Sequence, residues 1–200
     1  TGHGLLYSLA PVLSVSLGGS VVREYDGTAV ASVLSSHLQV AAGVVDGDQI
    51  LLSGPGSAAY TTGGTGPAAK DVGSQKTVEA SGVSVLSASK NSMPVYGYTL
   101  ASTTASGQIG EITPKEVTLS ASKVYDGLLA LGQGTVNIQT GVGSETLGYT
   151  AALSSDAHVG TAQKFIAALT LADASDGSGG LAINYKLPTL DATKAPVTIM

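Results

Sequence analysis

A three-residue motif that occurs twice at a wide spacing is the feature that most constrains the fold of this chain. Tyr25-Asp26-Gly27 returns as Tyr125-Asp126-Gly127, and a cationic residue stands two positions before each tyrosine, Arg23 and Lys123. Self-similarity at a wide, regular spacing is typical of repeated structural units. The motif therefore predicts two copies of one small domain within the 200 residues.

Two further pairs of landmarks support this prediction because they follow the motif in the same order. Residues 71–73 match 158–160, and residues 98–100 match 185–187 across an equal distance. The two copies of the Tyr-Asp-Gly motif are further apart in the sequence than the two copies of each later landmark. The first repeat therefore carries an insertion after its motif. A Gly-, Ser-, Thr- and Pro-rich run near 54–67 has the composition of an exposed loop and is the expected place for it.

Proline marks the expected boundaries, because it lacks an amide donor and interrupts a strand. A small residue, a proline and a strand-like segment follow one another at Pro11, Pro114 and Pro196. Residues 7–9 also resemble the Tyr-x-Leu that closes each repeat. The predicted division is the tail of a preceding repeat over 1–11, a first repeat over 12–112, a second repeat over 113–194, and the start of a following repeat over 195–200.

Alternating polar and apolar residues at 83–86, 116–121 and 135–138 are typical of half-buried strands. Only residues 162–171 contain reasonable helix formers, and they suit a strand equally well. The expected fold class is all-β: two tandem small β domains arranged end to end. An Ig-like β-sandwich is favoured for each, with a β-grasp-like sheet as the alternative.

Composition narrows the functional classes. The net charge of −5 with only 12% charged residues provides no basic surface for nucleic acid. Cysteine is absent, which excludes disulfides and thiolate ligands. The longest apolar stretch, over 5–17, is interrupted and too short for a transmembrane segment.

Acidic residues in two turns are the candidate metal ligands. Asp46 and Asp48, and separately Asp173 and Asp176, could offer oxygen ligands to calcium. Neither segment matches an EF-hand loop, and Asp-Gly pairs are common in turns. Turns are the primary interpretation of both segments, with calcium as the alternative cofactor.

The repeated motif has a structural interpretation and a binding one. In the first, the aspartates 26 and 126 accept amide hydrogen bonds in a turn, the glycines 27 and 127 adopt positive φ, and the tyrosines pack at the edge of the core. In the second, an exposed tyrosine contacts a ligand. A candidate ligand loop is the insertion with its Tyr60. No nucleophile elbow, dinucleotide fingerprint or paired acids indicate an enzyme, so no catalytic residue is expected.

These motifs together resemble the YDG repeat, which is related to the MBG repeat. The residues that carry the resemblance are 123–127, Gly47-Asp48, 71–73, 98–100 and 112–115. The second repeat departs from the pattern at His158, at Leu128 and Leu129, and at Ser144, which takes the place of Asp48.

The resemblance implies tandem repeats of large exported bacterial proteins, notably filamentous-haemagglutinin-like adhesins. The expected function is that of a structural stalk or spacer in a secreted or surface-anchored adhesin, supporting attachment to surfaces or biofilm. The expected location is extracellular, on the bacterial surface, and the expected partners are neighbouring repeats of the same chain. The alternative is a module that binds a polysaccharide, a surface glycan or a protein through loops of the first repeat.

Overall fold

The computed structural model describes residues 10–62 and 69–200, which belong to two compact units. Unit 1 runs to Arg23 and resumes over Thr28–Ile112, whereas unit 2 comprises Glu24–Gly27 and Thr113–Met200. Four residues from the early part of the chain therefore fold with unit 2. Predictions that fall on residues 1–9, including the tail of a preceding repeat, lie outside the described residues.

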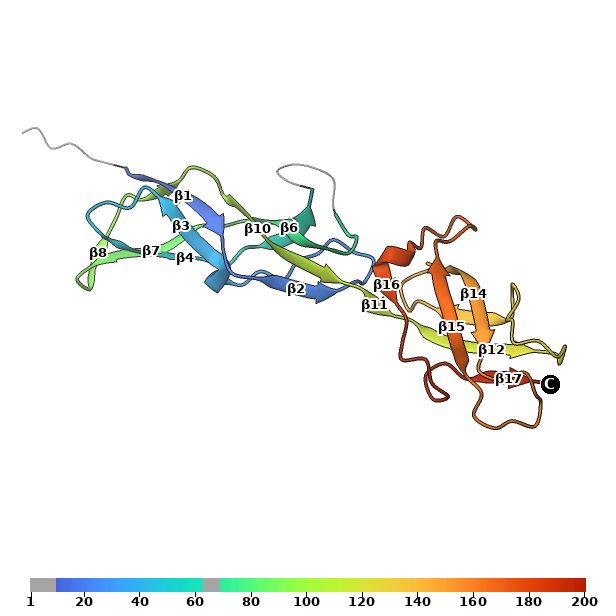
Figure 1. Ribbon diagram of the computed structural model, residues 1–200. Coiled ribbons are helices and arrows are strands. Elements are labelled where there is room, and N and C mark those ends of the chain that lie inside the picture. Colours follow the sequence, from blue (N-terminus) through green and yellow to red (C-terminus); the bar gives the residue numbers. More distant parts are fainter. Residues whose placement is uncertain (1–9, 63–68) are drawn as a thin grey trace, which may run out of the picture. The chain divides into compact units, whose positions relative to one another are not determined.

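Strands dominate both units (Figure 1). The described helices are single 3₁₀ turns, η1 (Ser35–His37) and η2 (Ala182–Asn184). The predicted all-β class is confirmed. No helix within 10–62 and 69–200 has the length and apolar character needed to cross a membrane.

Unit 1 is built from three small groups of strands. The first is β3-β1-β9, the second β2-β10-β6-β5 and the third β4-β7-β8. Their bounds are β1 Val12–Leu17, β2 Val21–Glu24, β3 Leu38–Ala42, β4 Gln49–Leu52, β5 Ser57–Thr61, β6 Gly73–Ser81, β7 Val85–Lys90, β8 Met93–Val95, β9 Thr99–Leu100 and β10 Thr104–Thr113.

Tyr60 lies in the core of unit 1, which corrects its assignment to an exposed ligand loop. It belongs to β5, its exposed fraction is 0%, and its hydroxyl donates to the Val21 carbonyl at 3.2 Å. The ring packs so closely on β10 that a Cβ at Gly110 would lie 2.7 Å from it. The Gly- and Ser-rich composition predicted a loop, but residues 57–61 pair with β6 and bury one large ring.

Unit 2 has a smaller set of strands. β13-β12-β17 form one group, β14-β15 an antiparallel pair and β11-β16 a parallel pair. Their bounds are β11 Lys115–Glu116, β12 Thr118–Lys123, β13 Val136–Gln139, β14 Gly148–Ser154, β15 Ile166–Ala172, β16 Tyr185–Lys186 and β17 Val197–Ile199. The segment that suited either a helix or a strand thus contributes β15.

Residues 195–200 belong to unit 2, which corrects their assignment to a following repeat. β17 pairs in parallel with β12, and Val197 and Ile199 are buried. Their alternating burial anchors the last strand to the core of unit 2. Pro196 therefore marks the start of a strand within this unit. At Pro114, by contrast, one strand does end and another begin, since β10 ends at Thr113 and β11 starts at Lys115.

Candidate functional site

A carboxylate shared by two tyrosines is the most distinctive polar arrangement in unit 2. The Tyr25 hydroxyl donates to Glu145 Oε1 at 2.8 Å, and the Tyr185 hydroxyl donates to Glu145 Oε2 at 2.7 Å. The two rings meet edge to face, with centroids 5.4 Å apart and planes at 79°. Tyr25 has an exposed fraction of 0% and Tyr185 of 5%. We call these three residues the tyrosine–carboxylate cluster.

Backbone contacts place each member of the cluster. Tyr185 begins β16, which pairs with β11. Glu145 closes a turn in which its amide donates to the Val142 carbonyl at 3.0 Å. Tyr25 is held by its own amide, which donates to the Thr113 carbonyl at 2.9 Å. Three separate segments are thereby fixed around one carboxylate.

Gly27 completes the contact because a side chain at its place would be strained and would collide with a neighbour. Its φ is +80°, in the left-handed region that glycine tolerates best. A Cβ at this position would also lie 2.7 Å from Val142 Cγ1, which is too close. Val142 is itself buried. The glycine of the motif thus lets the backbone lie directly against the Glu145 turn.

The electrostatics of the cluster favour protonated phenols. Burial raises the pKa of Tyr185, and the hydrogen bond to the Glu145 carboxylate raises it further. A neutral phenol can donate to the carboxylate, whereas a phenolate would repel it. Two neutral donors also compensate the carboxylate for lost hydration. The raised pKa moves Tyr185 away from neutral pH, so the arrangement suits a structural contact better than proton transfer.

Unit 1 contains a counterpart of part of this cluster. The Tyr98 hydroxyl donates to Asp48 Oδ2 at 2.7 Å and accepts from the Val45 amide at 3.0 Å. The Asp48 amide donates to the Val45 carbonyl at 3.0 Å, as the Glu145 amide does to Val142. β9 follows Tyr98 directly and pairs in parallel with β1, as β16 pairs with β11.

This correspondence changes one match made from the sequence. The hydrogen bonds align Asp48 with Glu145, and not with Ser144. The carboxylate is present in both units, carried once by Asp and once by Glu. The two sites differ in exposure: Val45 is 40% exposed, whereas its counterpart Val142 is 6% exposed.

The cation before each motif fixes the chain that follows it. The Arg23 guanidinium donates to Thr28, through both the side-chain hydroxyl and the carbonyl. Lys123 is buried, and its ammonium donates to Asp126 and to the Leu128 carbonyl, each at 2.6 Å. In both places the cation contacts the residue five positions further on. These hydrogen bonds hold the two ends of the motif together, a role that the sequence did not reveal.

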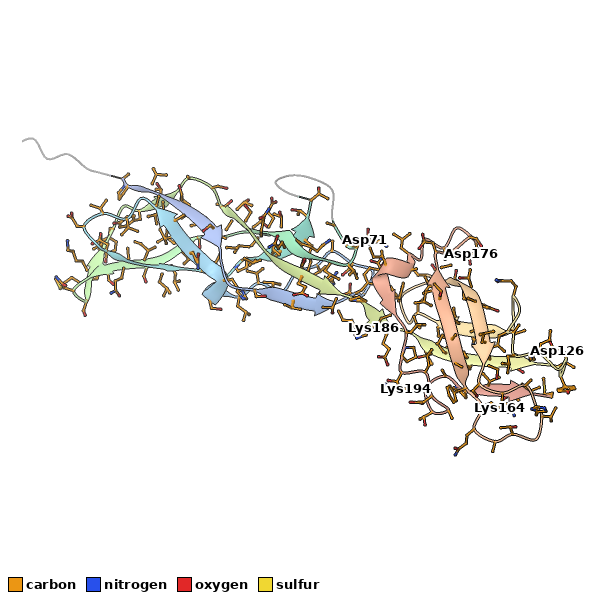
Figure 2. All side chains as sticks on the ribbon, viewed as in Figure 1. Asp71, Asp126, Lys164, Asp176, Lys186 and Lys194 are labelled. Atoms are coloured by element: carbon orange, nitrogen blue, oxygen red, sulfur yellow. The ribbon has the colours of Figure 1, made fainter. Side chains whose placement is uncertain are left out.

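The second copy of the motif forms the predicted turn but is not packed like the first. Gly127 has φ of +74°, and Asp126 Oδ1 accepts from the Leu128 amide at 2.9 Å. The hydrogen bond from Lys123 lowers the pKa of Asp126. Tyr125, however, is 51% exposed. Figure 2 shows Asp126 at the edge of unit 2, and the same view in Figure 1 marks Met200 nearby as C.

The aspartates considered as calcium ligands lie in two places. Asp46 pairs with Lys90 at 3.8 Å, and Asp48 accepts from Tyr98. Asp173 accepts from the Ala182 amide at 2.7 Å. Asp176 accepts from the Thr146 hydroxyl at 2.6 Å, and this bond together with those from Ser178 lowers its pKa to about 2. Within the described ranges no three acidic or histidine side chains gather as a metal site would require.

Comparisons of the chain with protein-family models, with curated proteins and with solved structures found no match.

We predict that Gly27→Ala destabilises unit 2 more than Gly127→Ala does. Both substitutions place an alanine at positive φ, which costs on the order of 1 kcal/mol. Only Gly27→Ala also forces a Cβ against Val142, whereas the nearest atom at Gly127 is the Tyr125 hydroxyl at 3.9 Å. Chemical denaturation of the two variants should show unit 2 less stable in Gly27→Ala by a further 1–3 kcal/mol, roughly the cost of overpacking. Equal losses would contradict the close contact.

We also predict that Tyr185 makes unit 2 sensitive to alkali. The pKa of Tyr185 is raised in the folded state, so the unfolded chain loses this proton first, above about pH 10. The stabilisation is complete below that pH and is lost as the pH rises toward the folded-state pKa. Tyr185→Phe should lower the free energy of unfolding at pH 7 by about 1–3 kcal/mol. Above pH 10 the free energy of unfolding of Tyr185→Phe should fall less steeply than that of the unsubstituted chain. Parallel declines of the two free energies would contradict this assignment.

Proposed function

We propose that this chain is a pair of YDG-type spacer repeats from a large secreted or surface-anchored bacterial adhesin. In this role the repeats hold an adhesive region away from the cell and bear load, supporting attachment to surfaces or biofilm. Catalysis is not part of the proposal. The motif order in the sequence is the reason for choosing this class of protein.

The observation that carries the proposal is the recurrence of one hydrogen-bonded arrangement in both units. Tyr98 with Asp48, and Tyr185 with Glu145, each join a tyrosine to a carboxylate on a neighbouring turn. Each tyrosine immediately precedes or begins a short strand that pairs in parallel with the first strand of its unit. Repetition of a structural unit, with the same internal contacts, is what a spacer array requires.

The strand order of unit 2 suits a load-bearing role. β12 and β17 are parallel neighbours, with Ala121 opposite Val197 and Lys123 opposite Ile199. Tension applied at the start of β12 and at the end of β17 pulls these strands along their length in opposite directions. The hydrogen bonds between them are then loaded together, because they lie across the direction of pulling.

Tyr60 no longer supports the alternative of a ligand-binding loop. The side chain is fully buried and its hydroxyl is bonded to the backbone of unit 1. The spacer proposal needs no ligand contact from this residue. A ring in the core stabilises the fold and presents no surface to a glycan.

We predict that pulling the chain from its two ends by single-molecule force spectroscopy gives two separate unfolding events. Each should release on the order of 300 Å of chain, at about 3.3–3.6 Å per residue. Tyr185→Phe is the matched variant and should lower the force of one event only, because it weakens unit 2. A single event, or gradual extension without a force peak, would contradict a role as load-bearing repeats.

Surface labelling and binding assays test the adhesin part of the proposal separately. Antibodies against the chain should label intact source cells, and a glycan array should show no saturable binding by these repeats. Labelling only after permeabilisation would contradict the surface location. Saturable glycan binding that survives Tyr60→Phe but is lost on deleting residues 62–68 would favour the binding alternative.

A further inference from the structure

The turn at Tyr125-Asp126-Gly127 has the conformation of its buried counterpart but lacks its surroundings. Gly127 has φ of +74° and Gly27 of +80°. The Tyr125 amide donates to the Met200 carbonyl at 2.8 Å, just as the Tyr25 amide donates to the Thr113 carbonyl at 2.9 Å. The backbone that presents the tyrosine is thus the same in both places.

The surface around Tyr125 is unusually apolar. Val124 is 73% exposed, Leu128 59%, Leu129 46% and Met200 64%. Three of these residues lie within four positions of Tyr125 in the sequence, and Met200 accepts the hydrogen bond from its amide; Tyr125 is itself 51% exposed. Contiguous exposed apolar side chains mark an interaction surface more often than a solvated one.

Unit 2 shows what covers such a tyrosine. Tyr25, in an equivalent turn, is buried against Tyr185 and hydrogen bonded to the Glu145 carboxylate. The adjoining Gly27 lies against Val142. Tyr185, Glu145 and Val142 of unit 2 therefore form the receptor for the motif.

Unit 1 carries a receptor of the same chemistry. Asp48 accepts a hydrogen bond from Tyr98, and the Glu145 carboxylate shows that such a group can accept from a second phenol as well. Val44 and Val45, on the turn before Asp48, are 41% and 40% exposed. Val45 corresponds to Val142, and the burial of Val142 indicates the change in exposure that an incoming motif would produce.

We propose that residues 124–129 form a docking surface for another repeat of this kind, with the Tyr125 hydroxyl donating to the carboxylate of that repeat's tyrosine–carboxylate pair. Gly127 lies against the valine of the receiving turn, and the exposed leucines lie at the rim. The partner is a repeat that carries Tyr98 with Asp48, or Tyr185 with Glu145. This inference stands without the spacer role, because it concerns how repeats join and not what the whole protein does.

The proposal is tested on the full chain extended by one further repeat. Residues 114–200 are appended directly after Met200, because Met200 occupies the place of Thr113 in the equivalent hydrogen bond. The appended copy carries Tyr125→Phe, so that the original Tyr125 is identified by mass. Nitration of tyrosines by tetranitromethane, with peptide mapping, then measures the exposure of each ring. Tyr25 is the buried control in every sample.

In the 200-residue chain Tyr125 should react readily and Tyr25 slowly. In the extended chain the reaction of Tyr125 should slow by about tenfold or more, since a hydrogen bond to a carboxylate contributes roughly 1.5–3 kcal/mol and 1.4 kcal/mol is a factor of ten. Glu145→Gln in the appended copy should restore part of the reactivity. The matched Glu116→Gln in that copy, whose carboxylate contacts Lys194, should leave it unchanged.

Folding of the appended copy is checked by the protection of its Tyr149, which is buried in unit 2. A folded copy with Tyr125 as reactive as in the shorter chain would overturn the proposal. Should that copy fail to fold, residues 11–113 are appended instead, which offers the Tyr98–Asp48 receptor. Unchanged Tyr125 reactivity there would likewise overturn it. Neither result depends on whether the protein is an adhesin, so failure here is distinct from failure of the spacer proposal.

Discussion

The hydrogen bonds from two tyrosines to the Glu145 carboxylate are the constraint on which the account of this protein depends. A carboxylate that is half buried must recover the hydration it loses, and two neutral hydroxyl groups do so here. The same bonds tie a segment from early in the sequence to unit 2. Because Tyr25 is fully buried, its ring stabilises unit 2 by apolar packing in addition to the hydrogen bond of its hydroxyl.

Two neighbouring features let a four-residue segment be held so firmly. Gly27 removes the side chain that would collide with Val142, and its positive φ turns the chain back. A cation two residues before the tyrosine then fixes the returning backbone, through Arg23 in one copy and Lys123 in the other. The motif is therefore a compact turn whose two ends are held together by the hydrogen bonds of the cation.

The sequence predicted the all-β fold and the turn conformation of the motif because both follow from local chemistry. Alternation of polar and apolar residues determines strands, and glycine at positive φ determines a turn. The partner of Tyr25 could not be predicted in this way, since Glu145 is distant in sequence and the match between the two repeats had placed Ser144, and not Glu145, opposite Asp48. Tyr60 was placed in a loop because its neighbours are small and polar. Its burial depends on pairing with β6, which composition does not encode.

The central claim is that Tyr25 is coupled to Glu145, and a double-mutant cycle with Tyr25→Phe and Glu145→Gln tests it most directly. The free energy of unfolding of unit 2 should show a coupling of about 1–3 kcal/mol between the two sites, as expected for a hydrogen bond to a charged group. The matched cycle with Tyr125→Phe and Glu145→Gln in the same chain should give a coupling near zero. Additive effects of Tyr25→Phe and Glu145→Gln would contradict the account.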